Sequence, residues 1–217
     1  MIKKLYQKNS VLNQYIAEIR DIDIQKDSLR FRKNLERIGE IFAYEISKTL
    51  VFESKEVITP LGSTDVPVLK ENPILIPVLR AGLPLHTGLQ NIFDKSESAF
   101  ISAYRKVGKS KKFIINVEYV SSPELTDKTV IIADSMAATG ASIVAVYKEL
   151  LNHGKIKHAH IVIIIASAEG IDFINKHLPS KNVTIWVGAI DDELTAKAYI
   201  VPGLGDAGDL AFGSKNS

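Results

Sequence analysis

The stretch from Thr129 to Leu151, TVIIADSMAATGASIVAVYKELL, constrains the fold of this chain more than any other segment. Four apolar residues at 130–133 have the pattern of a buried parallel strand, and Asp134 ends that run with a carboxylate. A loop of small residues follows. Apolar residues then recur every three or four positions up to Leu151, which predicts one face of a helix. A strand, a short loop and a helix form the basic unit of a parallel α/β sheet.

The loop in this unit has the features of a phosphate-binding turn. Gly140 and Ala141 let the backbone approach a ligand closely, and Thr139 and Ser142 add hydroxyl donors beside the positive end of the helix. Asp134 can then hydrogen-bond the diol of the sugar that carries the phosphate. The loop has neither the Lys of a Walker A loop nor the G-x-G-x-x-G of a dinucleotide turn. On the loop alone, a unit that uses small residues only for close packing remains an alternative.

Further apolar runs predict the rest of the sheet. ILIPVL at 74–79 and the run from Ala99 to Tyr104 read as strands, as do the segments that begin at residues 158 and 182. Helical patterns alternate with them, so we expect a mainly parallel, doubly wound sheet. Ligands of such sheets lie beyond the carboxyl ends of the strands. The candidate site residues are therefore Arg80, Arg105, Asp134 to Ser142, Ala166 to Glu169, and the segment after Asp191.

The chain begins with a helical region, which we define as an N-terminal arm over residues 1–54. A first helix is predicted around Leu12 to Ile19. A longer one, capped by Asp27 or Ser28, carries an apolar stripe that ends at Leu50. A helix of this length is more than a parallel unit needs, so we expect it to pack on a second subunit in a homodimer. Residues 55–70 read as two extended pieces around a Gly-Ser-Thr-Asp turn at 62–65.

Two arginines and a cluster of lysines suit a substrate with several phosphates. Arg80 and Arg105 each follow a predicted strand, where a guanidinium can bind a phosphate or diphosphate through two hydrogen bonds. The alternative for each is a surface arginine that pairs with a carboxylate. Residues 106–128 break the strand–helix pattern and predict a flexible β-extension. Its basic cluster is either a solvated tip or a flap that closes over the substrate and excludes water: Lys106, Lys109, Lys111 and Lys112.

The segment YIVPGLGDAGDLAFG, residues 199–213, holds four glycines and a proline, so we predict neither helix nor strand there. Its backbone groups around Ile200 and Gly205 to Ala207 can line up against the edge of a flat heterocycle. The alternative is a loop that only covers the core. Asp191, Asp192 and Glu193 precede this segment and read either as a solvated turn or as an acidic Mg²⁺ site.

Composition excludes several classes of function. A net charge of +2 gives no basic surface for nucleic acid, and the absence of cysteine excludes disulfides and thiolate sites. No apolar run approaches the length of a membrane span, and the first residues lack the apolar core of a signal peptide. We therefore expect a cytoplasmic protein with no membrane partner. The five histidines have no metal-ligand spacing; only His158 and His160 would point the same way on a strand.

Five segments together resemble the uracil phosphoribosyltransferase family of type I phosphoribosyltransferases: RAGLPLHTG, the Tyr-Arg at 104–105, ADSMAATGAS, ASAEGI and YIVPGLGDAGDLAFG, in this order. The resemblance covers essentially the whole chain. It implies one domain over residues 1–217, with a type I phosphoribosyltransferase-like α/β fold, a doubly wound, mainly parallel sheet. The extension at 106–128 becomes a flap, and residues 191–217 become a uracil-binding tail or hood. The implied reaction converts uracil and 5-phospho-α-D-ribose 1-diphosphate (PRPP) into UMP and diphosphate.

The resemblance also implies the roles of individual residues. Arg80 and Arg105 would face the diphosphate, with Asp134 and Asp206 as the other catalytic residues. Mg²⁺ would be bound mainly through PRPP, with no metal site built from protein ligands, and GTP is implied as an effector. The PRPP site would comprise Arg80, Arg105, Asp134, Ser135, Met136, Ala137, Ala138, Thr139, Gly140, Ala141, Ser142 and Asp206. The uracil site would comprise Ile200, Gly205, Asp206 and Ala207.

Four positions depart from the family pattern. Ser135, Ala137 and Ala141 replace Pro, Leu and Gly in the loop, and Ala168 replaces a Pro. Ala141 matters most, because a Cβ there costs on the order of 1 kcal/mol if the position requires a positive φ. These changes keep open a catalytically weak, nucleotide-sensing regulator with the same fold. The long N-terminal helix keeps open a structural subunit of a larger complex.

Overall fold

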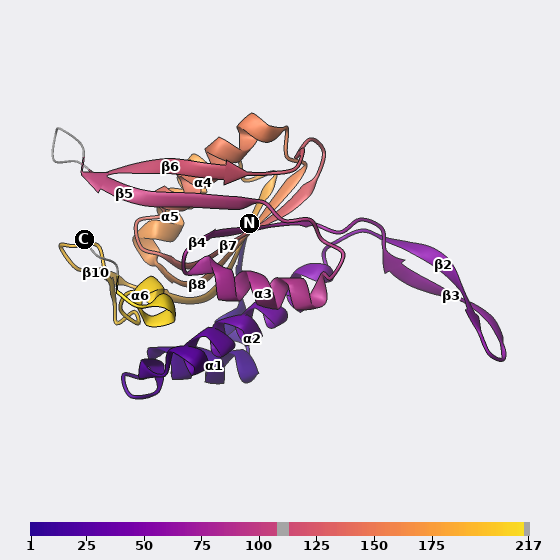
Figure 1. Cartoon of the computed structure of the whole chain (residues 1–217), viewed down its shortest axis with the longest axis horizontal. Helices are drawn as coiled ribbons and strands as arrows, with labels where there is room; N and C mark the ends of the chain where they lie inside the picture. Colours follow the sequence, from indigo (N-terminus) through magenta and orange to yellow (C-terminus); the bar gives the residue numbers. More distant parts are fainter. Residues whose placement is uncertain (108–112, 215–217) are drawn as a thin grey trace.

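A computed structural model of the chain describes residues 1–107 and 113–214, and of residues 103–107 and 113–117 only the backbone. Its centre is a seven-stranded sheet in the order β1-β9-β8-β7-β4-β5-β6 (Figure 1). Neighbouring strands are parallel except for β5 and β6, as predicted. The strands are β1 Ile2–Lys4, β4 Ile74–Leu79, β5 Phe100–Val107, β6 Phe113–Ser121, β7 Thr129–Ala137, β8 His158–Ser167 and β9 Val183–Asp191.

Helices cover both faces of the sheet, which makes it doubly wound. The helices α4 (Ala141–Leu150) and α5 (Ala168–His177) pack on one face, and α1 (Val11–Arg20), α2 (Ser28–Ser47) and α3 (Gly82–Ile92) lie on the other. Successive residues of β7 alternate between the two cores: Val130 and Ile132 belong to the first, Ile131 and Ala133 to the second. Both faces of the central strands are apolar for this reason, as is typical of parallel sheets.

The N-terminal helices form as predicted but pack within the same chain. Asp27 caps α2 by accepting hydrogen bonds from the backbone N–H groups of Leu29 and Arg30. The apolar stripe of α2 is fully buried by α1, α3 and the sheet, and the helix ends at Ser47. The apolar stripe therefore packs within the chain, and the packing of the N-terminal arm on a second subunit stays a prediction. The buried residues of the stripe include Leu35, Ile38, Phe42 and Ile46.

The strands β2 (Phe52–Thr59) and β3 (Gly62–Leu69) form a two-stranded antiparallel hairpin that projects from the body (Figure 1). The turn is at residues 60–61, and Gly62 to Asp65 belong to β3, so the predicted position of the turn was wrong. The reason is that Pro60 cannot supply a strand N–H, which favours its place in the turn. The hairpin of β5 and β6 projects toward the side of the molecule that carries β10 and α6.

The C-terminal segment contains regular structure, contrary to prediction. The short strands β10 (Glu193–Leu194) and β11 (Ile200–Val201) pair, and α6 (Ala207–Phe212) follows. Asp206 begins α6 because its carboxylate accepts a hydrogen bond from the N–H of Asp209. Short 3₁₀ helices occupy Leu5–Gln7, Ile24–Lys26 and Leu151–His153, and the peptide bonds 79–80 and 201–202 are cis. In the described part of the chain, no helix is long and apolar enough to span a membrane.

Candidate active site

A cavity of about 530 Å³ lies at the carboxyl ends of β4 and β7. It brings together most of the residues that sequence analysis placed in the PRPP and uracil sites. These are Arg80, Asp134 to Gly140, Ser142, Ile200, Gly205, Asp206 and Ala207. The position agrees with the rule that ligands of parallel α/β sheets bind beyond the strand ends. Residues that are distant in the sequence therefore line the same cavity.

The loop between β7 and α4 is shorter than predicted, because β7 continues to Ala137. Gly140 precedes α4 with a left-handed φ of 73°, and Ala141 is the first helical residue. Among the described residues other than glycine, only Asp127 and Ala198 have a positive φ. Ala141 is thus free of the strain that we considered for it. The backbone N–H of Ala141 lies 3.5 Å from the Thr139 hydroxyl at the start of α4.

The start of α5 holds this loop in place. The Ser167 hydroxyl donates a hydrogen bond of 2.5 Å to the carbonyl of Ala138 and accepts one of 2.8 Å from the N–H of Gly170. A Cβ on Gly170 would lie 2.5 Å from the same carbonyl, so the close approach requires glycine. Sequence analysis used ASAEGI only as a family motif. Its local signal is a serine cap followed three residues later by glycine.

Asp134 lies within β7 and lines the cavity, rather than ending the strand as predicted. Desolvation by burial raises the pKa of Asp134 from 3.8 to about 7, although backbone N–H groups of Met136 and Ser135 favour its ionised form. The N–H of Met136 lies 3.4 Å from its Oδ1. A carboxyl group whose pKa lies this close to neutrality is typical of functional sites.

Arg80 follows β4 and links the two halves of the cavity. Its Nη2 donates to Asp209 Oδ1 at 3.0 Å and to the carbonyl of Gly213 at 3.3 Å. Its Nε is buried and has no hydrogen-bond partner within the described part of the chain. The backbone of Arg105 lies inside β5 rather than after it, and its side chain is outside the described residues, as are the side chains of the four flap lysines.

The C-terminal segment forms the other wall of the cavity. Asp206 uses Oδ1 to cap α6, so only its second oxygen is free of that bond. Three residues of the β10–β11 turn also line the cavity and were not predicted from the sequence: Lys197, Ala198 and Tyr199. Asp209, the partner of Arg80, was not predicted either. A carboxylate in the same loop as the predicted uracil site was the available signal.

Asp191 has a structural environment that the sequence did not reveal. It is buried at the end of β9 and pairs with Arg20 at 2.8 Å, so a solvated turn was the wrong interpretation for this residue. Asp192 and Glu193 are exposed. No group of three or more His, Cys, Asp or Glu side chains in the described residues is arranged to hold a metal ion.

His158 and His160 point the same way from β8, as predicted, with ring centroids 4.7 Å apart. The indole N–H of Trp186 donates to Nδ1 of His160 at 3.0 Å. Burial, and then the charge of His158, lower the pKa of His160 to about 3. His160 is therefore part of the packed interior, His158 is half-buried beside it, and neither lines the cavity.

Comparison with known proteins agrees with this geometry. A family model described as uracil phosphoribosyltransferase matches residues 6–214. A protein named uracil phosphoribosyltransferase from Porphyromonas gingivalis is 50% identical over 208 residues, 96% of each chain. One of the same name from Pyrococcus furiosus is 40% identical over 211 residues, 96% of this chain and 88% of the relative.

Solved structures show the same fold. The AQ2163 protein from Aquifex aeolicus is 31% identical, covers 98% of both chains and superposes with a TM-score of 0.87. A hypoxanthine phosphoribosyltransferase from Staphylococcus aureus is 12% identical, with a TM-score of 0.52 over 86% of this chain and 83% of that one; at this identity only the fold is comparable. By the family model and these relatives, this chain belongs to the uracil phosphoribosyltransferase family.

Proposed function

We propose that this chain transfers the phosphoribosyl group of PRPP to uracil, giving UMP and diphosphate, a reaction of pyrimidine salvage. The observation that carries the proposal is the shared cavity, which is lined by Asp134 to Gly140 and by Tyr199, Ile200 and Gly205 to Gly208. The residues from Asp134 to Gly140 have the features of a phosphate and ribose site, and the C-terminal residues offer backbone groups to a flat base. Family membership supports the enzyme and does not favour the nucleotide-sensing regulator.

In this proposal the segment 134–142, from the end of β7 to the start of α4, binds the ribose 5-phosphate. The backbone N–H groups at the start of α4 and the hydroxyls of Thr139 and Ser142 are donors for phosphate oxygens. Asp134 accepts hydrogen bonds from the ribose diol. The unpartnered Nε of Arg80 supplies a donor for the diphosphate. Arg105 keeps its proposed place on the diphosphate side.

Uracil is proposed to lie against Ile200 and Gly205 to Ala207, where main-chain N–H and C=O groups match its alternating acceptors and donor. The bond between C1 of the ribose and the diphosphate oxygen breaks, and the diphosphate keeps the electron pair. Uracil N1 forms the new bond to C1, and its proton passes to solvent water. No enzyme nucleophile takes part, so the protein contributes positioning and electrostatic stabilisation. Asp206 is proposed to orient the base through its free carboxylate oxygen.

Mg²⁺ is proposed as the cofactor, bound mainly through the oxygens of PRPP; Asp134 and Asp206 line the same cavity, and their carboxylates suit the water ligands of such an ion. When bound, it would neutralise charge on the diphosphate oxygens, which would supply its other ligands. The protein itself binds the phosphoribosyl group through residues 134–142 and uracil through Ile200 and Gly205 to Ala207.

Further proposals concern parts outside the cavity. We retain the single-domain division with a flap at 106–128, supported by the β5–β6 hairpin on the side of β10 and α6. A cytoplasmic location is supported by the absence of cysteine, and GTP remains a proposed effector. A homo-oligomer is now supported by the β2–β3 hairpin, because an isolated hairpin is marginally stable alone and Ile58 and Leu61 at its tip are exposed.

The test is conversion of labelled uracil to UMP by the purified chain with Mg²⁺ and PRPP. Asp134→Asn should lower kcat/KM by about two orders of magnitude or more, because the variant loses a charged acceptor in the site. Leu151→Ala, an exposed change outside the cavity, is the matched control and should leave turnover intact. Turnover with hypoxanthine in place of uracil would contradict the proposed base site. Addition of GTP to the same assay tests the effector.

A further inference from the structure

A buried ion pair lies behind the proposed uracil loop, outside the cavity. Arg20, the last residue of α1, donates to both carboxylate oxygens of Asp191, each at 2.8 Å. The Asp191 side chain is only 7% exposed, and that of Arg20 21%. The planar guanidinium fits this bidentate arrangement, which a lysine could not reproduce. Arg20 and Asp191 thus join the C-terminal end of α1 to the end of β9.

Both members of the pair also hold Gly203. Arg20 donates a hydrogen bond of 2.9 Å to the Gly203 carbonyl, and the Gly203 N–H donates one of 2.9 Å to Asp191 Oδ2. The backbone of one loop residue is thus fixed on its donor side and its acceptor side at once. A buried ion pair adds little net stability relative to apolar packing, so its main effect here is on geometry.

Gly203 transmits this restraint to the cavity wall. It has a left-handed φ of 56°, and a Cβ at this position would collide with the carbonyl of Ile200. Ile200 and Gly205 line the cavity on either side of it in the sequence, whereas Gly203 does not. The pair therefore acts on the backbone that faces the base without touching the base itself.

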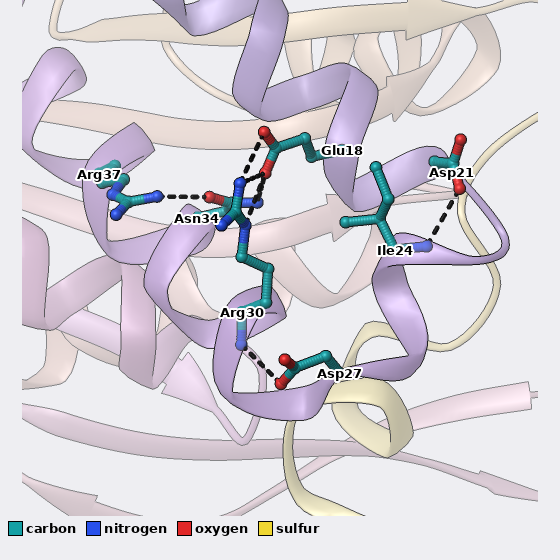
Figure 2. A network of polar contacts seen from close by, with 7 residues as sticks. All are labelled: Glu18, Asp21, Ile24, Asp27, Arg30, Asn34 and Arg37. Carbon is teal, nitrogen blue, oxygen red and sulfur yellow. Dashed lines mark hydrogen bonds and ion pairs between the residues drawn. The ribbon is translucent and has the colours of Figure 1, made fainter.

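The C-terminal end of α1, which carries Arg20, is itself held in place by contacts with α2. Glu18, near the end of α1, accepts hydrogen bonds from Arg30 at 2.9 and 3.0 Å and from Asn34 at 2.7 Å (Figure 2). Asn34 is fully buried, and Arg37 donates to its side-chain oxygen. Figure 2 shows these contacts joining α1 to α2, which itself packs on α3 and the sheet.

We infer that Arg20, with Asp191, is a positioning residue for uracil: it sets the place of the Ile200 and Gly205 backbone groups that recognise the base. The inference rests on the proposed function, because it assigns that loop to uracil. It requires that loss of the Arg20 contacts weakens uracil binding while the loop at 134–142, and with it PRPP binding, is unaffected.

The test compares Arg20→Lys with Arg30→Lys. Arg20→Lys keeps the positive charge but cannot make the three hydrogen bonds to Asp191 and Gly203. Arg30→Lys instead weakens the contact with Glu18 that joins α2 to α1. For Arg20→Lys we expect the KM for uracil to rise about tenfold and the KM for PRPP to stay within about twofold. Arg30→Lys should leave the ratio of the two KM values unchanged, even where it lowers the melting temperature.

Hydrogen exchange provides a readout independent of turnover. In Arg20→Lys the amide of Gly203 should exchange faster, and the amides at 134–142 should not change. An unchanged uracil KM with unchanged exchange at Gly203 would overturn the inference, as would an equal rise of both KM values in both variants. Wild-type protein that fails to convert uracil would overturn the proposed function itself, and the inference with it.

Discussion

Replacement of Asp134 by Asn should change how the stability of this protein depends on pH. The Asp134 carboxyl has a pKa of about 7 in the folded chain against an ordinary value of 3.8, and burial is the main cause. Between these values the native state holds a proton that the unfolded chain has released. The free energy of unfolding therefore falls as pH rises through this window and levels off above pH 7.

The size of the effect follows from the two pKa values. The slope approaches about 1.36 kcal/mol per pH unit inside the window, so the wild-type chain loses about 2.5 kcal/mol from this group between pH 5 and pH 8. The amide side chain of the Asp134→Asn variant cannot ionise, so the variant escapes this loss. Its stability relative to wild type should thus increase by the same amount over this range.

Urea unfolding at pH 5, 6, 7 and 8 measures this difference directly. Ser142→Ala is the matched control, because it changes the same cavity without altering a titratable group. Its stability should run parallel to that of wild type. If the curves for wild type and Asp134→Asn were also parallel, Asp134 would not titrate in this range, and the assignment of its raised pKa to burial would be refuted.

Three further predictions concern conformation and assembly. Gly140→Ala should lower the free energy of unfolding by roughly 1–2 kcal/mol and raise the KM for PRPP, because φ is 73° and a Cβ would lie 2.5 Å from the Gly170 carbonyl. Urea unfolding and initial rates measure these effects, and unchanged values would contradict the backbone geometry. Gly203→Ala should raise the KM for uracil and leave that for PRPP intact in the same assay. Ile58→Asp with Leu61→Asp should dissociate the proposed homo-oligomer in light scattering; a monomeric wild type would refute the proposal.

The elements with local signals could be predicted from the order of residues alone. The apolar run at 130–133, the small-residue loop and the periodic helix after it predicted the central unit. Asp27 and the stripe behind it predicted α2. These signals depend on spacing along the chain and on caps within a few residues, so no distant contact is needed to recognise them. The candidate cavity residues followed from the same logic, because parallel strands end at one edge.

The tertiary structure decided which of these residues meet and what holds them. Arg20 contacts Asp191 and Gly203 across sequence separations of 171 and 183 residues, and Arg80 contacts Asp209 across 129. No local pattern indicates such pairs, since an arginine has the same appearance in the sequence whether it is solvated or buried against a carboxylate. The burial that raises the pKa of Asp134 is likewise a sum over several elements. Pairing and desolvation depend on how strands and helices pack, and that is why they became visible only in the folded chain.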